Sequence, residues 1–503
     1  MDDRLARLKT LLAEIADLSA VSHLLAWDQQ VNLPAAAAET RGRQLAALGR
    51  ISHNLATSPE LGRLIESLRE PAERLDPDSD DARLIRTAAR DFEKETRVPS
   101  EFVAEFELAA AVAFSAWTEA RAKSDFSLFQ PHLEQLVGLR RRYIGFFPPS
   151  EHPYDILLDD FDPGLKTAEV RAVFDALRPE QTALIRRIAG LEPPDDSFLH
   201  RPFDEQSQLA FGREVITRFG FDWNRGRLDR SAHPFSDGLG DGDTRITTRV
   251  DPAFFTDCFF SILHEAGHGL YDQGIPPEIE RGPLGRNLSL SVHESQSRLW
   301  ENLVGRSLPF WECFYPRLLE VFPSLADIPL ERFHRGINRV QPSLIRTDAD
   351  EATYNLHVML RFELELALME GSLAVRDLPE AWNERMREYL GVVPDDDAHG
   401  VLQDVHWSSG LFGYFPTYAL GNLVSVQLWE AAARDLPDLE SQIRAGAFGE
   451  LLAWLREKVH RHGRKFSSQD LVRRVTGSPI DPQPYLRYLE RKFGALYHLP
   501  SGT

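Results

Sequence analysis

Residues 259–272 read FFSILHEAGHGLYD, and this stretch decides which fold and site to expect. His264 and His268 are four residues apart, so on a helix both imidazoles project from one face and can reach the same metal ion. Glu265 is displaced around the helix, where it can accept a proton from an attacking water without being a ligand. The apolar residues before the motif predict a buried helix, and buried polar groups need a partner such as a metal.

A third metal ligand should come from a second element, because a catalytic zinc usually has three protein ligands. Residues 291–306, SVHESQSRLWENLVGR, supply Glu294 at the start of a helix patterned by leucine, tryptophan and valine. His, His and Glu form a recurrent zinc-binding set. Two plainer interpretations stay open: the motif could mark a surface helix with two unrelated histidines, and Glu294 could be a first-turn acid favoured by the helix dipole.

Helical patterning extends outward from this motif over most of the chain. Ser58 and Pro59 precede apolar residues at spacings of three and four, which predicts a helix over residues 59–70. Further helices are expected over residues 100–121, over 125–145 and from 167 onward, with a proline-rich break before the last of them. The sequence therefore predicts an all-α, predominantly helical fold.

We expect one domain over residues 1–503 with two sub-regions. The first, about 1–145, is a series of antiparallel helices; the second, about 225–425, holds the candidate site. Residues 233–250, HPFSDGLGDGDTRITTRV, are rich in glycine and aspartate and end in a β-prone run, which predicts a small hairpin or sheet beside the site. That run could present a strand edge to a substrate main chain or form a simple structural hairpin.

Composition restricts the partners and the compartment. A net charge of -20 disfavours nucleic acid and anionic membranes as partners. No apolar stretch is long enough to suggest a membrane span. Cys258 and Cys313 are too few for a disulfide framework or a thiolate zinc site, and the N-terminus lacks the pattern of a signal peptide. We therefore expect a cytoplasmic protein.

Six short segments extend the pattern around the motif: HPF (233–235), DTRIT (243–247), HEAGH (264–268), HESQS (293–297), IRTDAD (345–350) and GVLQDVHW (400–407). In content and order they resemble the carboxypeptidase Taq family of metallocarboxypeptidases, and the resemblance spans nearly the whole chain. It implies a helical fold related to neurolysin and angiotensin-converting enzyme, with a deep central groove. It also implies release of single C-terminal residues with broad specificity, usually by a homodimer, and a metal-ligand role for Glu294.

The same resemblance implies how the site is completed. Peptide hydrolysis needs a group that stabilises the developing oxyanion. Related helical peptidases use a histidine and a tyrosine from a similarly spaced segment, which implies His406 and Tyr418 as oxyanion donors and Tyr414 as a contact to the substrate backbone. Either tyrosine could instead be an aromatic side chain packed in a glycine-rich turn.

A carboxypeptidase must bind a free carboxylate, and the planar fork of arginine is suited to this task. Arg346 is our candidate and Arg245 the second choice, although Arg346 could serve an internal salt bridge instead. His233 could line the substrate pocket or cap a turn. Gln403 could orient the His406 imidazole or contact the substrate.

Many H-E-x-x-H peptidases with a distant glutamate ligand place an aspartate four residues after it, which orients a ligand histidine. Here that position is Arg298, so the outer partner of the ligand histidines stays unassigned. Zinc and cobalt share ligand preferences, so the motif allows either ion.

Three functions are compatible with these motifs. The first is a metallocarboxypeptidase that acts on peptides with a free C-terminus. The second is an endopeptidase or peptidyl-dipeptidase on the same scaffold, with a groove that continues past the metal. The third is a non-catalytic metal- or peptide-binding protein, which would keep the ligands but lose the base, whereas Glu265 is present.

Overall fold

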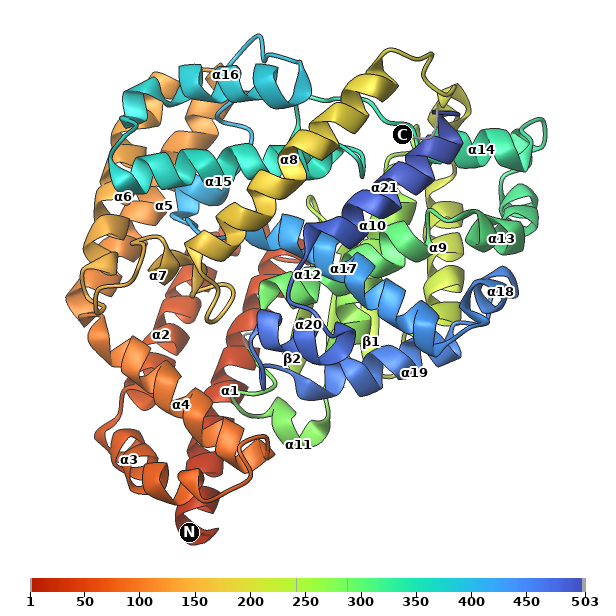
Figure 1. Ribbon diagram of the computed structural model, residues 1–503. Helices are drawn as coiled ribbons and strands as arrows, with labels where there is room; N and C mark the ends of the chain where they lie inside the picture. The colour runs from red at the N-terminus through yellow and green to blue at the C-terminus, as the bar shows by residue number, and fades with distance from the viewer. Residues whose placement is uncertain (1, 241, 287, 500–503) are drawn as a thin grey trace.

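Helices build almost all of the computed structural model, which describes residues 2–240, 242–286 and 288–499 (Figure 1). The N-terminal helices are α1 (Asp2–Val31), α2 (Ala38–Ala56), α3 (Pro59–Glu73), α4 (Asp80–Arg97), α5 (Ser100–Lys123) and α6 (Gln130–Ile144). Ser58 caps α3 by accepting a hydrogen bond from the backbone N–H of Leu61 at 3.3 Å. The helices expected in this region are therefore confirmed, with small shifts at their ends.

Three helices connect this region to a small sheet: α7 (Asp155–Leu158), α8 (Thr167–Ala189) and α9 (Glu205–Phe219). The sheet has the strands β1 (Gly226–Arg230), β2 (Ser236–Gly240) and β3 (Asp243–Thr248) in the order β1-β3-β2. β2 pairs antiparallel with β3, and β1 pairs parallel with it. The small sheet is thus confirmed. Because β3 is the middle strand, the idea that it offers a free edge to a substrate is wrong.

The catalytic sub-region and the C-terminal part continue as helices. They are α10 (Phe255–Asp272), α11 (Pro277–Glu280), α12 (Leu290–Arg298), α13 (Leu308–Val321), α14 (Leu330–Ile337), α15 (Tyr354–Glu370), α16 (Leu378–Leu390), α17 (Pro416–Asp435), α18 (Leu439–Arg444), α19 (Gly449–Lys458), α20 (Ser468–Thr476) and α21 (Pro482–Leu496). A π-helical turn, η4 (Leu299–Val304), continues α12 directly.

Helix α12 packs against both α10 and α17, and glycine makes the first of these contacts possible. An ideal Cβ built on Gly267 of α10 would lie 2.6 Å from the carbonyl oxygen of Gln296 in α12. Any side chain at this position would push the two helices apart, because their backbones are in direct contact. The close approach brings the H-E-x-x-H motif next to the helix that carries Glu294.

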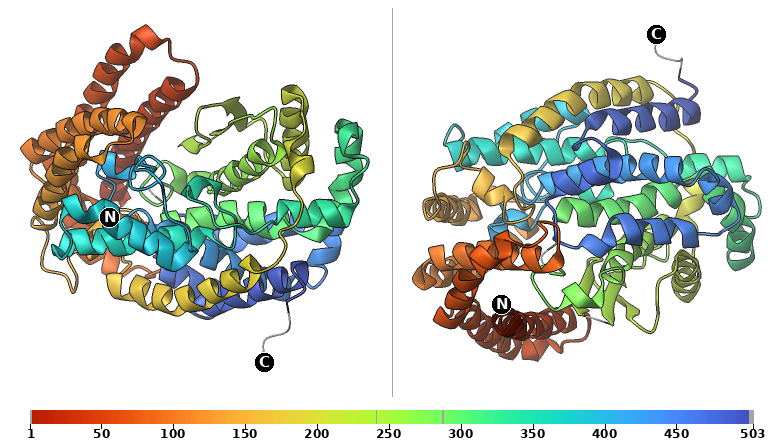
Figure 2. Two further views of the ribbon diagram at one scale, coloured as in Figure 1. Left: turned by 90° about the horizontal axis from the view of Figure 1, so that it is seen from above. Right: turned by 60° about the horizontal axis from the view of Figure 1, so that its bottom comes forward.

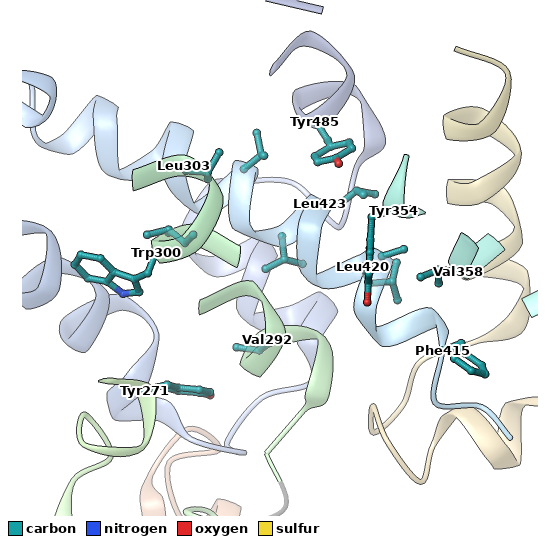
Figure 3. Packing of buried hydrophobic residues seen from close by; sticks show 14 of the residues in the cluster. Tyr271, Val292, Trp300, Leu303, Tyr354, Val358, Phe415, Leu420, Leu423 and Tyr485 are labelled. Atoms are coloured by element: carbon teal, nitrogen blue, oxygen red, sulfur yellow. The ribbon is translucent and has the colours of Figure 1, made fainter. Parts of the chain in front are cut away.

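One contiguous cluster of buried apolar side chains extends from Leu5 to Tyr497. Figure 3 shows part of it from close by, with Val292 of α12, Trp300 of η4, Leu420 of α17 and Tyr485 of α21 among the labelled residues. In the left view of Figure 2 the N-terminal helices lie at the left and the sheet with α9 and α10 lies to their right, with β2 in contact with α1. No described helix is long and apolar enough to cross a membrane.

Candidate active site

Three potential metal ligands come together where α10 meets α12. The Nε2 atoms of His264 and His268 lie 3.6 and 3.4 Å from Oε2 of Glu294, and all three donor groups lie within 4.8 Å of one another. Within the described residues it is the one group of three or more histidine, cysteine, aspartate or glutamate side chains whose ligand atoms lie this close together. Two imidazole nitrogens and one carboxylate suit a divalent ion such as zinc. The donors therefore fit a mononuclear metal site.

The Glu294 carboxylate is held in its ionised form by side chains of α12 and α10. It is 5% exposed and accepts hydrogen bonds from Arg298 Nε at 2.7 Å and from Ser297 Oγ at 3.0 Å. Burial alone would raise the pKa of Glu294, but Arg298 and the two neighbouring histidines hold it well below its ordinary value. A metal ligand must be deprotonated, and this arrangement keeps it so.

The outer partners of the two histidines, which the sequence left unassigned, are now identified. His264 Nδ1 lies 2.9 Å from Oε2 of Glu301, which belongs to the π-helical turn η4. His268 Nδ1 lies 2.6 Å from Nδ1 of His293. Arg298 lies 2.7 Å from Glu294 and 3.3 Å from Glu301, so it bridges these two carboxylates. It does not take the place of the aspartate that orients a ligand histidine in many other H-E-x-x-H peptidases.

Glu265 lies beside this group on α10 and is 7% exposed. Burial is the largest influence on its carboxyl and raises its pKa to about 7. A carboxyl group with a pKa near neutrality can both accept and return a proton at working pH, which is the property that a general base needs.

His406 and two tyrosines form an aromatic cluster next to the metal donors. His406 begins the short turn η8 (His406–Ser409), and its Nε2 lies 3.2 Å from the hydroxyl oxygen of Tyr418 at the start of α17. The rings of Tyr414 and Tyr418 have centroids 5.2 Å apart. Glu294 adds to the effect of burial in raising the pKa of both phenols, so its charge acts on this cluster. The structure thus brings these three candidates together.

Arg346 is buried, with 6% exposure, beside the same cluster. Its Nε and Nη2 donate to Oδ1 of Asp404 at 3.0 and 2.9 Å, and its Nη1 donates to the hydroxyl of Tyr354 at 2.9 Å. The guanidinium carbon lies 5.0 Å from the ring centroid of Tyr418. The internal salt bridge that we considered for Arg346 is therefore present, and the same side chain borders the aromatic cluster.

Gln403 uses both ends of its amide within the protein. Its Oε1 accepts from the backbone N–H of Arg346 and from Nη2 of Arg361, both at 2.8 Å. Its Nε2 donates to the carbonyl oxygen of Leu344 at 3.0 Å. Gln403 therefore holds the two arginines in place and does not contact His406 through any of these bonds.

Two further candidates lie in the sheet region. Arg245 on β3 forms a two-fold hydrogen bond to Asp243, and its guanidinium lies 4.2 Å from the ring centroid of Trp27 in α1. His233 is exposed in the connection between β1 and β2, and its carbonyl oxygen accepts a hydrogen bond from Ser231. Arg245 thus joins the N-terminal helices to the sheet.

Comparison with known proteins assigns the family. Residues 7–493 match the family model described as carboxypeptidase Taq (M32) metallopeptidase. The chain belongs to this family. It is 45% identical over 494 residues to thermostable carboxypeptidase 1 of Thermus thermophilus, covering 96% of this chain and 97% of that protein. Carboxypeptidase 1 of Bacillus subtilis is 37% identical, with coverage of 97% and 98%.

Solved structures agree with this assignment to the M32 family. The crystal structure of an M32 carboxypeptidase from Deinococcus radiodurans superposes with a TM-score of 0.96 at 43% identity, covering 99% of this chain and 100% of that one. The family resemblance, the mostly helical fold and the metallocarboxypeptidase activity that the motifs predicted are therefore confirmed. An M32 metallopeptidase needs a divalent ion, and His264, His268 and Glu294 are the residues that fit one.

Proposed function

We propose that the protein is a zinc-dependent carboxypeptidase that removes single C-terminal residues from peptides with broad side-chain tolerance. The observation that carries this proposal is the convergence of His264, His268 and Glu294 beside the buried carboxyl group of Glu265. Cobalt would suit the same donors. When bound, the divalent ion supplies Lewis acidity that polarises the scissile carbonyl and makes the attacking water more acidic.

Glu265 is the proposed general base. It accepts a proton from the attacking water and returns it to the amine of the departing C-terminal residue. Its raised pKa supports both steps, since neither the acid nor the carboxylate form is strongly favoured near neutrality.

His406 and Tyr418 are the proposed hydrogen-bond donors to the developing oxyanion. Burial lowers the pKa of His406 to about 3 and raises that of Tyr418 well above its ordinary value. Both groups are therefore uncharged near neutrality and keep a proton to donate. Donors fixed by burial stabilise charge without reorganising during the reaction. Tyr414, beside them, is proposed to contact the substrate backbone.

Arg346 is the proposed anchor for the substrate carboxylate. A guanidinium has five N–H groups, and the bonds of Arg346 to Asp404 and Tyr354 use three of them. Arg346 and Arg361 also share the single Asp404 carboxylate, so these three side chains carry an excess positive charge. A substrate carboxylate would neutralise that charge, and buried charges are stable only when paired.

The remaining candidates receive smaller roles in this proposal. Arg245 is committed to Asp243 and Trp27, which makes it a weaker anchor than Arg346. Gln403 acts as a positioning residue for Arg346 instead of a substrate contact. His233 is exposed and is proposed to line the entrance of the deep central groove that the family resemblance implies.

The deciding experiment compares an unblocked peptide with its C-terminally amidated twin, with and without a chelator, by mass spectrometry. We expect chelator-sensitive loss of single residues from the free peptide only. Internal cuts, or equal cleavage of both peptides, would assign the protein to the endopeptidase alternative with an open groove. Full retention of activity in the chelator, after added zinc and cobalt are shown not to bind, would reject the metal site.

We also propose a homodimer of single-domain chains that works in the cytoplasm. The family resemblance supports the dimer, and the two free thiols of Cys258 and Cys313 support a reducing compartment. Light scattering should give twice the chain mass of 57.1 kDa. A mass equal to one chain at micromolar concentration would reject the dimer, and fractionation of the producing cells would test the compartment.

A further inference from the structure

The two ligand histidines are supported in different ways. His264 Nδ1 lies directly against the carboxylate of Glu301, at 2.9 Å. His268 has a second histidine in the corresponding place, His293, whose Nδ1 is 2.6 Å away. The other ring nitrogen of His293 then lies 3.1 Å from Oδ1 of Asp272. Each ligand histidine is therefore supported by a carboxylate. His264 contacts that of Glu301 directly, whereas His268 reaches that of Asp272 through the imidazole of His293.

The direction of each hydrogen bond in this second chain follows from the metal site. Nε2 of His268 faces Glu294 at 3.4 Å, so this nitrogen must keep its lone pair for a metal ion. A neutral His268 then carries its proton on Nδ1 and donates it to Nδ1 of His293. His293 accepts there, carries its own proton on Nε2, and donates that proton to Asp272. One arrangement of protons satisfies every nitrogen in the chain.

Neighbouring elements fix the positions of His268, His293 and Asp272, which we call the relay. His293 directly precedes Glu294 on α12, so one helix turn positions both a ligand and the support of another ligand. Asp272 ends α10, one turn after His268, and β2 presses against it, since an ideal Cβ on Gly238 would lie 2.9 Å from its Cγ. The ring of Tyr271 lies 5.1 Å from that of His293. The side chains of His268, His293 and Asp272 are only 14–20% exposed, so water competes weakly for their hydrogen bonds.

We infer that His293 and Asp272 are positioning residues, which fix the proton position and ring orientation of His268 and thereby set the affinity for the metal ion. The inference rests on the proposed metal site. Outer partners of this kind typically change metal affinity by about 10- to 100-fold. The relay also differs from the direct Glu301 contact in one respect: the atom facing His268 Nδ1 is a ring nitrogen and not a carboxylate oxygen, so both imidazoles depend on Asp272 for their orientation.

The test uses three variants of the full-length protein. His293→Phe keeps the size of the ring but removes the acceptor. His293→Asn places an amide oxygen near the position of the lost Nδ1 and should restore the acceptor for His268. Asp272→Ala removes the end of the relay. His132→Phe, on α6 in the N-terminal sub-region, is the matched control for replacing a histidine by phenylalanine.

Zinc affinity of the metal-free proteins is measured by competition with a chelator, and the visible absorption bands are recorded for the cobalt-loaded forms. We expect His293→Phe to bind zinc about 10- to 100-fold more weakly and to shift the cobalt bands, with a smaller loss for Asp272→Ala. His293→Asn should stay within a few-fold of the parent, and the control should equal it. Melting temperatures of the metal-free proteins separate lost positioning from lost folding.

Several outcomes would overturn the inference. One is parental zinc affinity with unchanged cobalt bands in His293→Phe or, if that variant does not fold, in Asp272→Ala. Another is a loss in His293→Asn as large as in His293→Phe, because the restored acceptor would then be irrelevant. A parent protein that binds neither zinc nor cobalt would instead reject the proposed function, so the two failures are distinguishable.

Discussion

Gly421 of α17 lies directly against Glu294 of α12, and an ideal Cβ on Gly421 would be 2.5 Å from Cγ of that glutamate. This distance is shorter than any real side-chain contact, so only glycine allows the two helices to approach so closely. Three residues earlier, the same helix carries Tyr418. The positions of the proposed metal ligand and of the proposed oxyanion donor are therefore set by one helix contact.

Gly421→Ala should displace Glu294 and weaken metal binding. Insertion of a methyl group into a packed contact of this kind costs about 1–3 kcal/mol, and we expect zinc affinity to fall by about tenfold or more, with a lower melting temperature. Gly449→Ala is the matched control, because an added Cβ there meets no atom within 4 Å. Zinc content after dialysis against a weak chelator would measure the effect; equal retention by both variants would contradict the prediction.

Glu265→Gln should keep its metal but lose turnover, because an amide cannot accept the proton of the attacking water. General-base catalysis contributes typically about 10²- to 10⁴-fold, and kcat should fall within that range. Metal content is measured by atomic emission alongside kcat on an unblocked peptide. Near-normal turnover with full metal would remove Glu265 as the base.

Tyr418→Phe removes a hydroxyl donor while keeping the ring. Loss of one oxyanion donor typically costs about 10²- to 10³-fold in kcat, so we expect a fall in kcat with little change in KM. Tyr414→Phe should instead chiefly raise KM, since Tyr414 is proposed to contact the substrate backbone. The opposite division between kcat and KM would exchange the two roles.

Arg346→Ala should lower kcat/KM for peptides with a free C-terminus by about 10²-fold or more, because the truncation removes one partner of a buried carboxylate contact. The exposed Arg376→Ala, remote from any candidate role, is the control for loss of one positive charge. Melting temperatures are needed as well, since Asp404 would be left to Arg361 alone. An unchanged kcat/KM would transfer the anchoring role to Arg245 or another group.

Asp159 should make stability depend on pH in the acid range. Burial opposes its ionisation, but ion pairs with Lys94 at 3.1 Å and Arg90 at 2.5 Å lower its pKa to about 2. Because this folded-state pKa lies below the ordinary value of 3.8, the stabilisation is complete above about pH 4 and is lost as the pH falls through 2.

Asp159→Asn should therefore lower the melting temperature at pH 7. The difference in melting temperature between this variant and the parent protein should become smaller as the pH falls from 4 toward 2. Asp395→Asn, an exposed acid in the loop after α16, is the matched control and should change little. A deficit of constant size across this pH range would show that Asp159 stabilises the protein by some means other than its charge.

The parts of the site that follow from helical spacing could be predicted from the sequence. His264 and His268 had to share a face because a helix repeats every 3.6 residues, and Glu265 followed from the same motif. Helical spacing alone could not identify Glu294 as a candidate ligand, since any acid can begin a helix. The family resemblance pointed to this residue. For His406 and Tyr418 the resemblance was again decisive, because twelve residues and a glycine-rich turn separate them in the chain.

The supporting contacts could not be predicted in this way. Glu301, which contacts His264, lies in a π-helical turn that follows α12, and nothing in residues 299–304 predicts a change of helical type. The one usable signal was an acid two turns after Glu294. Likewise the parallel pairing of β1 with β3 depends on β2 lying outside β3, which local propensity does not encode. Such contacts arise from how distant elements cross.

Helix α21 shows how the fold depends on contacts between distant parts of the chain. It packs on α8 and α17, and Tyr488 near its middle donates a hydrogen bond to Glu351 at 2.7 Å (Figure 1). Helix α8 (Thr167–Ala189) lies about 300 residues before α21 in the chain. Contacts between residues so far apart in sequence are slow to form, because the entropy of closing the loop between them is lost first. We therefore expect the packing of α21 on α8 to be a late step of folding.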